Sequence, residues 1–172
     1  MIPASFLFLA LLAGQAPPPV NSEYVAPRVR GLDVHAVHLI TDGRARSRTV
    51  RSLLDRLQRG YLTVLVRTTG RLSHFGELRF LGTGGRYRYA EISIRVPSFE
   101  HDPVTWLAHE LQHAVEILEA PHIVDQATLK AHAMSTPGMV CRLDGSIESE
   151  AAQRVWAQVN AELMQEPPPP ER

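Results

Sequence analysis

The sequence lacks several features that mark large classes of protein. It has one cysteine, Cys141, so no disulfide can form within the chain. Neither charge sign is in excess, because 18 Lys and Arg residues balance 18 Asp and Glu residues. This balance argues against nucleic acid or an anionic membrane as a partner. No apolar run reaches the roughly 20 residues that a stable membrane span needs.

The composition instead indicates a globular protein with an unusual histidine content. Hydrophobic residues make up 44% and charged residues 21% of the 172 positions, which is close to the globular average. A chain of this length has room for one ordinary domain. Its eight histidines are the feature that bears most on function.

The N-terminus is typical of an exported protein. Residues 6–13 form a short apolar run that fits the hydrophobic region of a signal peptide, and Gly14 and Ala16 suit a cleavage site. We therefore predict a signal peptide over 1–16 and a secreted or periplasmic protein. A hydrophobic tail that is not cleaved is the alternative.

Proline runs separate the two ends of the chain from its middle. They occupy residues 17–19 and 167–170, and such runs form extended, solvated spacers that cannot join a packed core. The predicted organisation is a linker over 17–28, a folded domain over 29–164 and a tail over 165–172.

Within this domain the patterns predict an α+β fold. The strand predictions rest on β-branched and apolar runs, and the helix predictions rest on helical spacing of apolar residues. A glycine-rich hairpin turn is predicted over 82–86. The predicted strands are 32–40, 61–67, 78–81 and 87–96, and the predicted helices are 44–59, 103–119, 124–134 and 146–163.

The helix predicted over 103–119 carries the motif His109-Glu110-Leu111-Gln112-His113, or HExxH. Histidines four residues apart on a helix lie about 6 Å apart along its axis and about 40° apart around it, so both can bind one ion. The glutamate between them is then placed to act as general base on a metal-bound water. The alternative is a surface helix with chance histidines.

The helical wheel favours the metal site. The apolar face of the helix lies opposite His109 and His113, yet the large apolar residues Trp106 and Ile117 flank the histidines and suggest a cleft. Cys141 could close a structural His₂Cys site. A structural site, however, has no use for Glu110, which favours catalysis.

The third ligand is predicted to be Glu148. Glu116 lies about 10.5 Å along the helix axis from His109, too far for one ion, and is better placed as a supporting or surface residue. On the last predicted helix, Glu148 falls on the inward face and Glu150 points away. An inward carboxylate needs a partner, although Glu148 could merely complement the helix dipole.

Other histidines are weaker candidates. His122 and His132 could be ligands or hydrogen-bond donors to an oxyanion, or ordinary surface residues. His35 and His38 are predicted on opposite faces of the strand over 32–40.

The motif together with Glu148 resembles the zincin metallopeptidases, in particular the gluzincins, whose third ligand is a glutamate. The resemblance implies a zincin-like fold with Zn²⁺ held by His109, His113 and Glu148, and with Glu110 as general base. It also implies a peptide or protein substrate that pairs with an edge strand, here predicted as 87–96.

Two functions from different classes are therefore expected. The first is a zinc metallopeptidase that hydrolyses peptide bonds. The second is a metal- or peptide-binding module that keeps the scaffold but hydrolyses little. A plain structural domain with a coincidental motif is a third possibility.

Overall fold

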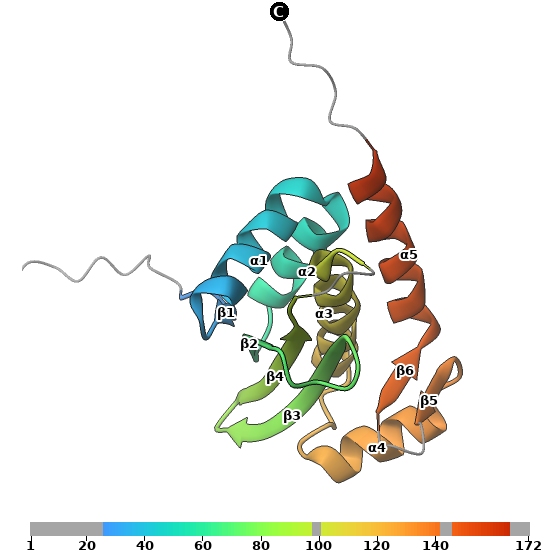
Figure 1. The fold of residues 1–172 in the computed structure, drawn as a ribbon. Coiled ribbons are helices and arrows are strands. Elements are labelled where there is room, and N and C mark those ends of the chain that lie inside the picture. The colour runs from blue at the N-terminus through green and yellow to red at the C-terminus, as the bar shows by residue number, and fades with distance from the viewer. Residues whose placement is uncertain (1–25, 98–100, 142–145, 166–172) are drawn as a thin grey trace, which may run out of the picture.

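The computed structural model describes residues 26–97, 101–141 and 146–165. These residues form a mixed α+β fold, which confirms the predicted class (Figure 1). The predicted signal peptide, most of the linker and the tail beyond residue 165 lie outside the described residues. The elements are β1 (Val29–Gly31), α1 (Val34–Arg46), α2 (Arg48–Gln58), β2 (Leu62–Thr69), β3 (Gly76–Gly84), β4 (Tyr87–Arg95), α3 (Pro103–Glu119), α4 (Gln126–Ser135), β5 (Met139–Cys141), β6 (Ile147–Ser149) and α5 (Glu150–Met164).

The main sheet has the strand order β1-β2-β4-β3. Strands β1, β2 and β4 are parallel, and β3 runs antiparallel to β4. The prediction that 87–96 is the edge strand is therefore wrong. β4 pairs with β2 along its whole length, and the tight turn after Gly84 places β3 on the outside.

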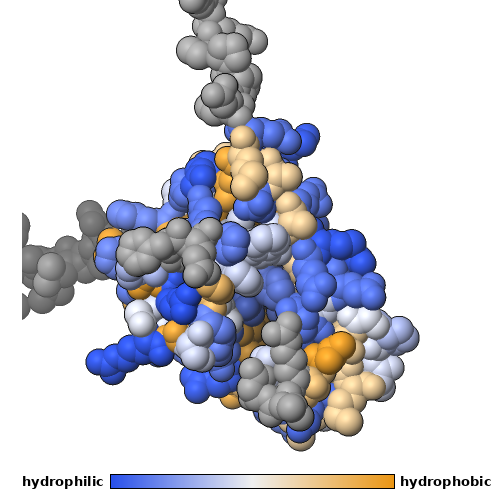
Figure 2. Space-filling model, turned by 45° about the vertical axis from the view of Figure 1, so that its right-hand side comes forward, coloured by the Kyte–Doolittle hydropathy of each residue, from blue (hydrophilic) through white to orange (hydrophobic). Residues whose placement is uncertain are grey.

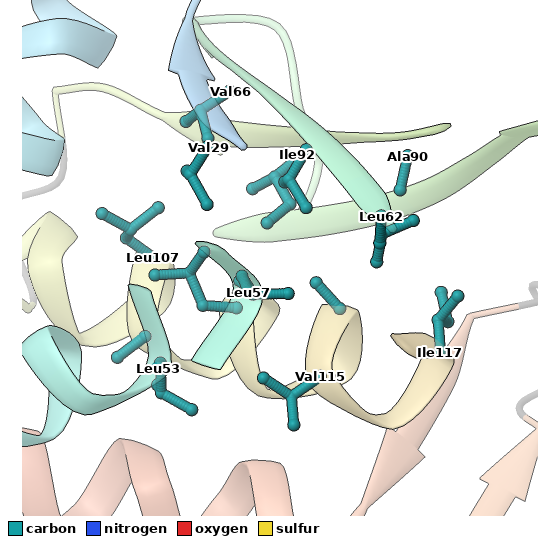
Figure 3. Close-up of a cluster of buried hydrophobic side chains, with 14 of the residues drawn as sticks. Val29, Leu53, Leu57, Leu62, Val66, Ala90, Ile92, Leu107, Val115 and Ile117 are labelled. Atoms are coloured by element: carbon teal, nitrogen blue, oxygen red, sulfur yellow. The ribbon is translucent and has the colours of Figure 1, made fainter. Parts of the chain in front are cut away.

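The hydrophobic core lies between this sheet and the helices. Figure 3 shows Leu62 and Ile92 of the sheet facing Leu107 of α3 and Leu57 of α2, and all four are fully buried. α5 packs on α3 and α2 rather than on the sheet. The result is three layers, with α3 in the middle one.

The predicted strand over 32–40 is wrong, because most of this segment is helix α1. The Asp33 carboxylate caps the helix by accepting a hydrogen bond from the Ala36 amide at 2.9 Å, and it also accepts one from the Thr68 amide of β2 at 2.8 Å. These contacts outweigh the β-propensity of the segment. His35 and His38 consequently lie on a helix and not on opposite faces of a strand.

The helix predicted over 44–59 is interrupted at Ser47. This residue has an extended backbone (φ −124°, ψ 126°) and its hydroxyl accepts a hydrogen bond from the Val50 amide, so it caps α2. The same hydroxyl donates to Glu162 of α5 at 2.5 Å. The break therefore creates an attachment point for the last helix.

The helix predicted to begin at Ser146 begins later. Residues Ile147–Ser149 form strand β6, which pairs with β5 in a small antiparallel sheet. The Ser149 hydroxyl accepts from the Ala152 amide and caps α5. The helix predicted over 124–134 is α4, and that over 103–119 matches α3.

The surface of the molecule is mainly hydrophilic in the view of Figure 2. The clearest patch of hydrophobic residues lies at the lower right of this view, near the level at which α4 and β5 lie in Figure 1. Met134 of α4 and Val140 of β5 are large exposed apolar side chains. In the described part of the chain, no helix combines the length and apolar character needed to cross a bilayer.

Candidate metal centre

The helix α3 presents the HExxH motif from the middle layer of the molecule. Asp102 caps the helix by accepting from the Val104 amide, and Pro103 occupies its first turn. His109, Glu110 and His113 are all buried, with exposed fractions of 6%, 5% and 6%. The face opposite the apolar face of the helix is thus covered by other elements and does not face solvent.

Three side chains converge on one point. The Nε2 atoms of His109 and His113 lie 3.2 Å apart. An oxygen of Glu148 lies 3.4 Å from the His109 Nε2 atom and 3.9 Å from the His113 Nε2 atom. Their ligand atoms all lie within 4.8 Å of one another, so the three residues could hold one metal ion.

Glu148 reaches this point from a different element than expected. It lies on β6, opposite Val140 of β5, and not on the inward face of a helix. Glu150, the competing candidate, is exposed and forms an ion pair with Arg154 at 3.3 Å. The structure therefore brings the predicted glutamate to the histidines and leaves the other on the surface.

Glu116 supports the site without joining the ligand group. One of its oxygens contacts the His113 Nδ1 atom at 2.9 Å, and the other accepts a hydrogen bond from the Ser149 hydroxyl at 2.6 Å. A partner on Nδ1 directs the Nε2 atom of the same ring toward the ligand group. Because Ser149 follows Glu148 directly, this carboxylate also links α3 to the strand that carries the third member.

Burial and neighbouring charges shift the pKa values of the ionisable groups in the site. Burial raises the pKa of Glu110 to about 7, with further raising by Glu148 and a partial offset from His113. Burial by itself lowers the pKa of His113, but the hydrogen bond with Glu116 and the nearby carboxylates outweigh it, and the net shift is upward. The same contact with His113 keeps the pKa of Glu116 low despite its burial.

Gly76 allows the edge strand β3 to lie directly against Glu110. A Cβ atom at position 76 would lie 2.7 Å from a Glu110 carboxylate oxygen and 3.0 Å from its Cγ atom. Only glycine fits without displacing this carboxylate. Gly76 and Ser149 belong to the site although no motif in the sequence indicates them. A serine followed by a helical stretch could have suggested the latter as a cap.

Aromatic rings form one wall of the site. Trp106 lies 5.9 Å from the His109 ring, stacks on Phe75 at 4.8 Å and contacts Trp156 of α5 at 5.7 Å, all between ring centroids. His101 packs edge-on against Trp156. The expected role of Trp106 as a large neighbour of the histidines is confirmed.

A cavity of about 700 Å³ adjoins the other side of the site. Glu110, His113 and Glu116 contribute polar groups to its lining, and Ile117 lies there as the sequence suggested. The edge strand β3 forms one side, and α4 and the β5–β6 sheet contribute the other. Its other apolar lining residues include Leu78, Phe80, Ile123, Leu129 and Ile147.

The remaining candidates lie outside the ligand group. Cys141 is not a member of the group formed by the described residues. His122 and His132 contact each other, and His132 alone of the two lines the cavity. Comparison of the chain with family models, with curated proteins and with solved structures gave no match.

Proposed function

We propose that this protein is a zinc-dependent metallopeptidase in which Glu110 acts as general base. The observation that carries the proposal is the meeting of His109, His113 and Glu148 beside a buried glutamate at the wall of a cavity. Catalytic zinc sites use three protein ligands and leave one position open. The arrangement supports the gluzincin-like interpretation of the motif.

The three side chains fit zinc in chemistry and in spacing. Two imidazoles and one carboxylate are donors that zinc commonly takes, and bonds of about 2.0–2.1 Å in a tetrahedron place ligand atoms about 3.3 Å apart. The separations of 3.2, 3.4 and 3.9 Å lie around this value. When bound, the ion would act as a Lewis acid that acidifies water and polarises a carbonyl.

Glu110 supplies the proton transfer. A general base works best when its pKa lies near the working pH, and in the metal-free protein burial raises the pKa of Glu110 to about 7. Its carboxylate can take a proton from the attacking water, hold it, and donate it to the leaving amine. Gly76 keeps the strand backbone close to this carboxylate and so limits the positions that it can adopt.

The cavity and the edge strand suggest an extended peptide as substrate. β3 is one of the two outer strands of the sheet, lies against Glu110 and lines the cavity. An edge strand can pair with an extended peptide through main-chain hydrogen bonds, while an adjacent pocket accepts a side chain. The apolar lining, with Leu78 and Phe80 on the strand, favours an apolar side chain there.

The test compares the full chain with Glu110→Gln after removal of metal and reloading with zinc. A mixed peptide library read by mass spectrometry should show cleavage by the wild type and a loss of rate of about 10³-fold in the variant, with the same zinc content. Glu119→Gln is the matched control, because Glu119 lies on the same helix but is exposed and pairs with Arg56.

Each other outcome has a defined meaning. If both proteins hold zinc and neither cleaves any peptide, the peptidase proposal fails and the metal- or peptide-binding module remains. If Glu110→Gln cleaves as fast as the wild type, Glu110 is not the base. If the wild type takes up no stoichiometric zinc, both metal functions fail.

A further inference from the structure

A second pair of imidazoles lies apart from the ligand group. The His122 Nε2 atom lies 3.2 Å from the His132 Nδ1 atom, although the residues are ten positions apart. The ring centroids are 5.0 Å apart, and the planes are inclined by 62°. The corresponding values for His109 and His113 are 3.2 Å, 4.9 Å and 78°. Two residues on different segments thus reproduce the spacing of the HExxH pair.

The backbone around His122 is fixed by its neighbours. Pro121 precedes it, and Ile123 follows it with a fully buried side chain and an amide that donates to the Ala120 carbonyl at 3.0 Å. Arg88 of β4 donates to that same carbonyl at 2.8 Å. The imidazole is exposed to solvent, but the chain that carries it is held against the protein core.

The backbone around His132 is ordered by contacts within α4 itself, a helix that contacts the rest of the protein mainly through β3 and β5. Asp125 and Thr128 form a capping box at the start of α4, and Leu129 and Ala133 are buried on the neighbouring positions of the helix. The His132 carbonyl accepts from the Thr136 amide at 3.0 Å. Both imidazoles therefore project from ordered backbone, which lowers the entropic cost of bringing them together on one ligand.

We propose that His122 and His132 bind a divalent transition-metal ion, such as Zn²⁺, Ni²⁺ or Cu²⁺, at a second site. A separation of 3.2 Å matches the roughly 3.3 Å between ligands of one tetrahedral ion with bonds near 2.0–2.1 Å. Imidazole nitrogen suits these ions and does not suit Mg²⁺ or Ca²⁺. The proposal stands independently of the peptidase function.

This site is more open than the first. Among the described residues, the one group of three or more ligand-type side chains is His109, His113 and Glu148, so water completes the coordination at the second pair. With fewer protein ligands and greater exposure, the second site binds more weakly. The affinity order should follow Cu²⁺ above Ni²⁺, with Zn²⁺ below Cu²⁺. His132 also lines the cavity, so a bound ion would add positive charge at its wall.

Calorimetric titration of the metal-free full chain with Zn²⁺ tests the proposal. The wild type should bind two ions, one tightly and one more weakly. His122→Ala should lose the weaker site and keep the tight one, whereas His109→Ala should do the opposite. His74→Ala is the control, because His74 is a half-exposed histidine that lines the same cavity outside the pair. It should keep both sites.

A second measurement does not depend on stoichiometry. Addition of a small amount of Cu²⁺ to zinc-loaded protein should broaden the imidazole resonances of His122 and His132 and leave those of His35 and His38, which lie on α1 and line a different pocket, sharp. A wild type with no weaker site, or a His122→Ala variant that retains it, would overturn the proposal. A wild type that lacks the tight site but binds zinc at the weaker one would count against the proposed peptidase alone.

Discussion

The two histidine pairs share a spacing and differ in almost everything around them. His109 and His113 are buried on one helix, with Glu148 nearby and a carboxylate behind the His113 ring. His122 and His132 lie on a loop and on a separate helix, with solvent beside them. The spacing decides whether two imidazoles can share an ion. The surroundings decide how tightly it is held and whether water bound there can react.

The largest effect on zinc affinity should come from removing the Glu148 carboxylate, because the pair of His122 and His132 has no such third group among the described residues. Zinc binding of about 10–16 kcal/mol spread over four ligands assigns roughly 3 kcal/mol to each. Glu148→Ala should therefore weaken zinc binding about 100-fold, measured by competition with a chromophoric chelator. Glu150→Ala should leave it unchanged, because Glu150 is exposed and paired with Arg154. Equal effects of the two changes would mean that Glu148 is not a ligand.

The next effect is a dependence of stability on pH, which arises because Glu110 beside the first histidine pair is buried. Glu110 carries a raised pKa of about 7, so below its unfolded pKa it is protonated in both states and costs nothing. Between pH 4.5 and about 7 the unfolded state releases this proton while the folded state still holds it, so stability falls across that window and the loss levels off above it. In metal-free protein, Glu110→Gln should match the wild type below pH 4.5 and exceed it at pH 8 by about 3 kcal/mol.

Urea denaturation in the presence of a chelator measures this difference across the pH range. His74→Ala and Glu119→Gln, which change exposed residues, should follow the wild-type profile. A difference between Glu110→Gln and the wild type that does not grow with pH would show that the buried carboxyl is not the titrating group.

A smaller effect concerns the residue behind the ligand. Supporting carboxylates change metal affinity by about 10- to 100-fold. Glu116→Gln keeps the shape and the contact with Ser149 but removes the charge that faces the His113 Nδ1 atom. We expect zinc binding about tenfold weaker, with a shifted visible spectrum in the Co²⁺-substituted protein. An unchanged spectrum and affinity would mean that Glu116 only links α3 to Ser149 and does not influence the metal.

The smallest effects should come from substituting the helix-capping residues, because each cap lies near only one of the two histidine pairs. Ser149 caps α5 beside the first pair, and Asp125 caps α4, which carries His132. Each change to alanine should lower the free energy of unfolding by about 1 kcal/mol. Calorimetric titration should then show weaker binding at the tight site for Ser149→Ala and at the second site for Asp125→Ala. Crossed or identical effects would contradict the separation of the sites.

The sequence predicted best where local signals agreed. Asp102 and Pro103 mark the start of α3, and the spacing of its apolar residues marks its extent. The bounds of the helix, and the position of both motif histidines on it, were therefore predicted correctly. Such a helix is specified by residues that are close together in the chain. The central strands β2 and β4 were likewise indicated by their β-branched runs.

The predictions failed where distant residues decide the structure. The segment after Leu32 is helical because Asp33 binds both Ala36 and Thr68, and the second contact joins residues 35 positions apart. Strand β6 exists because it pairs with β5, which a helical wheel cannot anticipate. Glu148 was therefore identified from the wrong element, and Gly76 was missed because its neighbour Glu110 lies far along the chain.

The weak attachment of α4 has a consequence for how the cavity could respond to a ligand. This helix contacts the rest of the protein mainly through β3 and β5, whereas α3 is clamped at its C-terminal end by Arg88 and covered by α5. Local opening starts where few buried contacts hold an element. In hydrogen exchange, α4 amides should exchange well before those of α3. One wall of the cavity can then adapt to its contents while the wall bearing Glu110 keeps its shape.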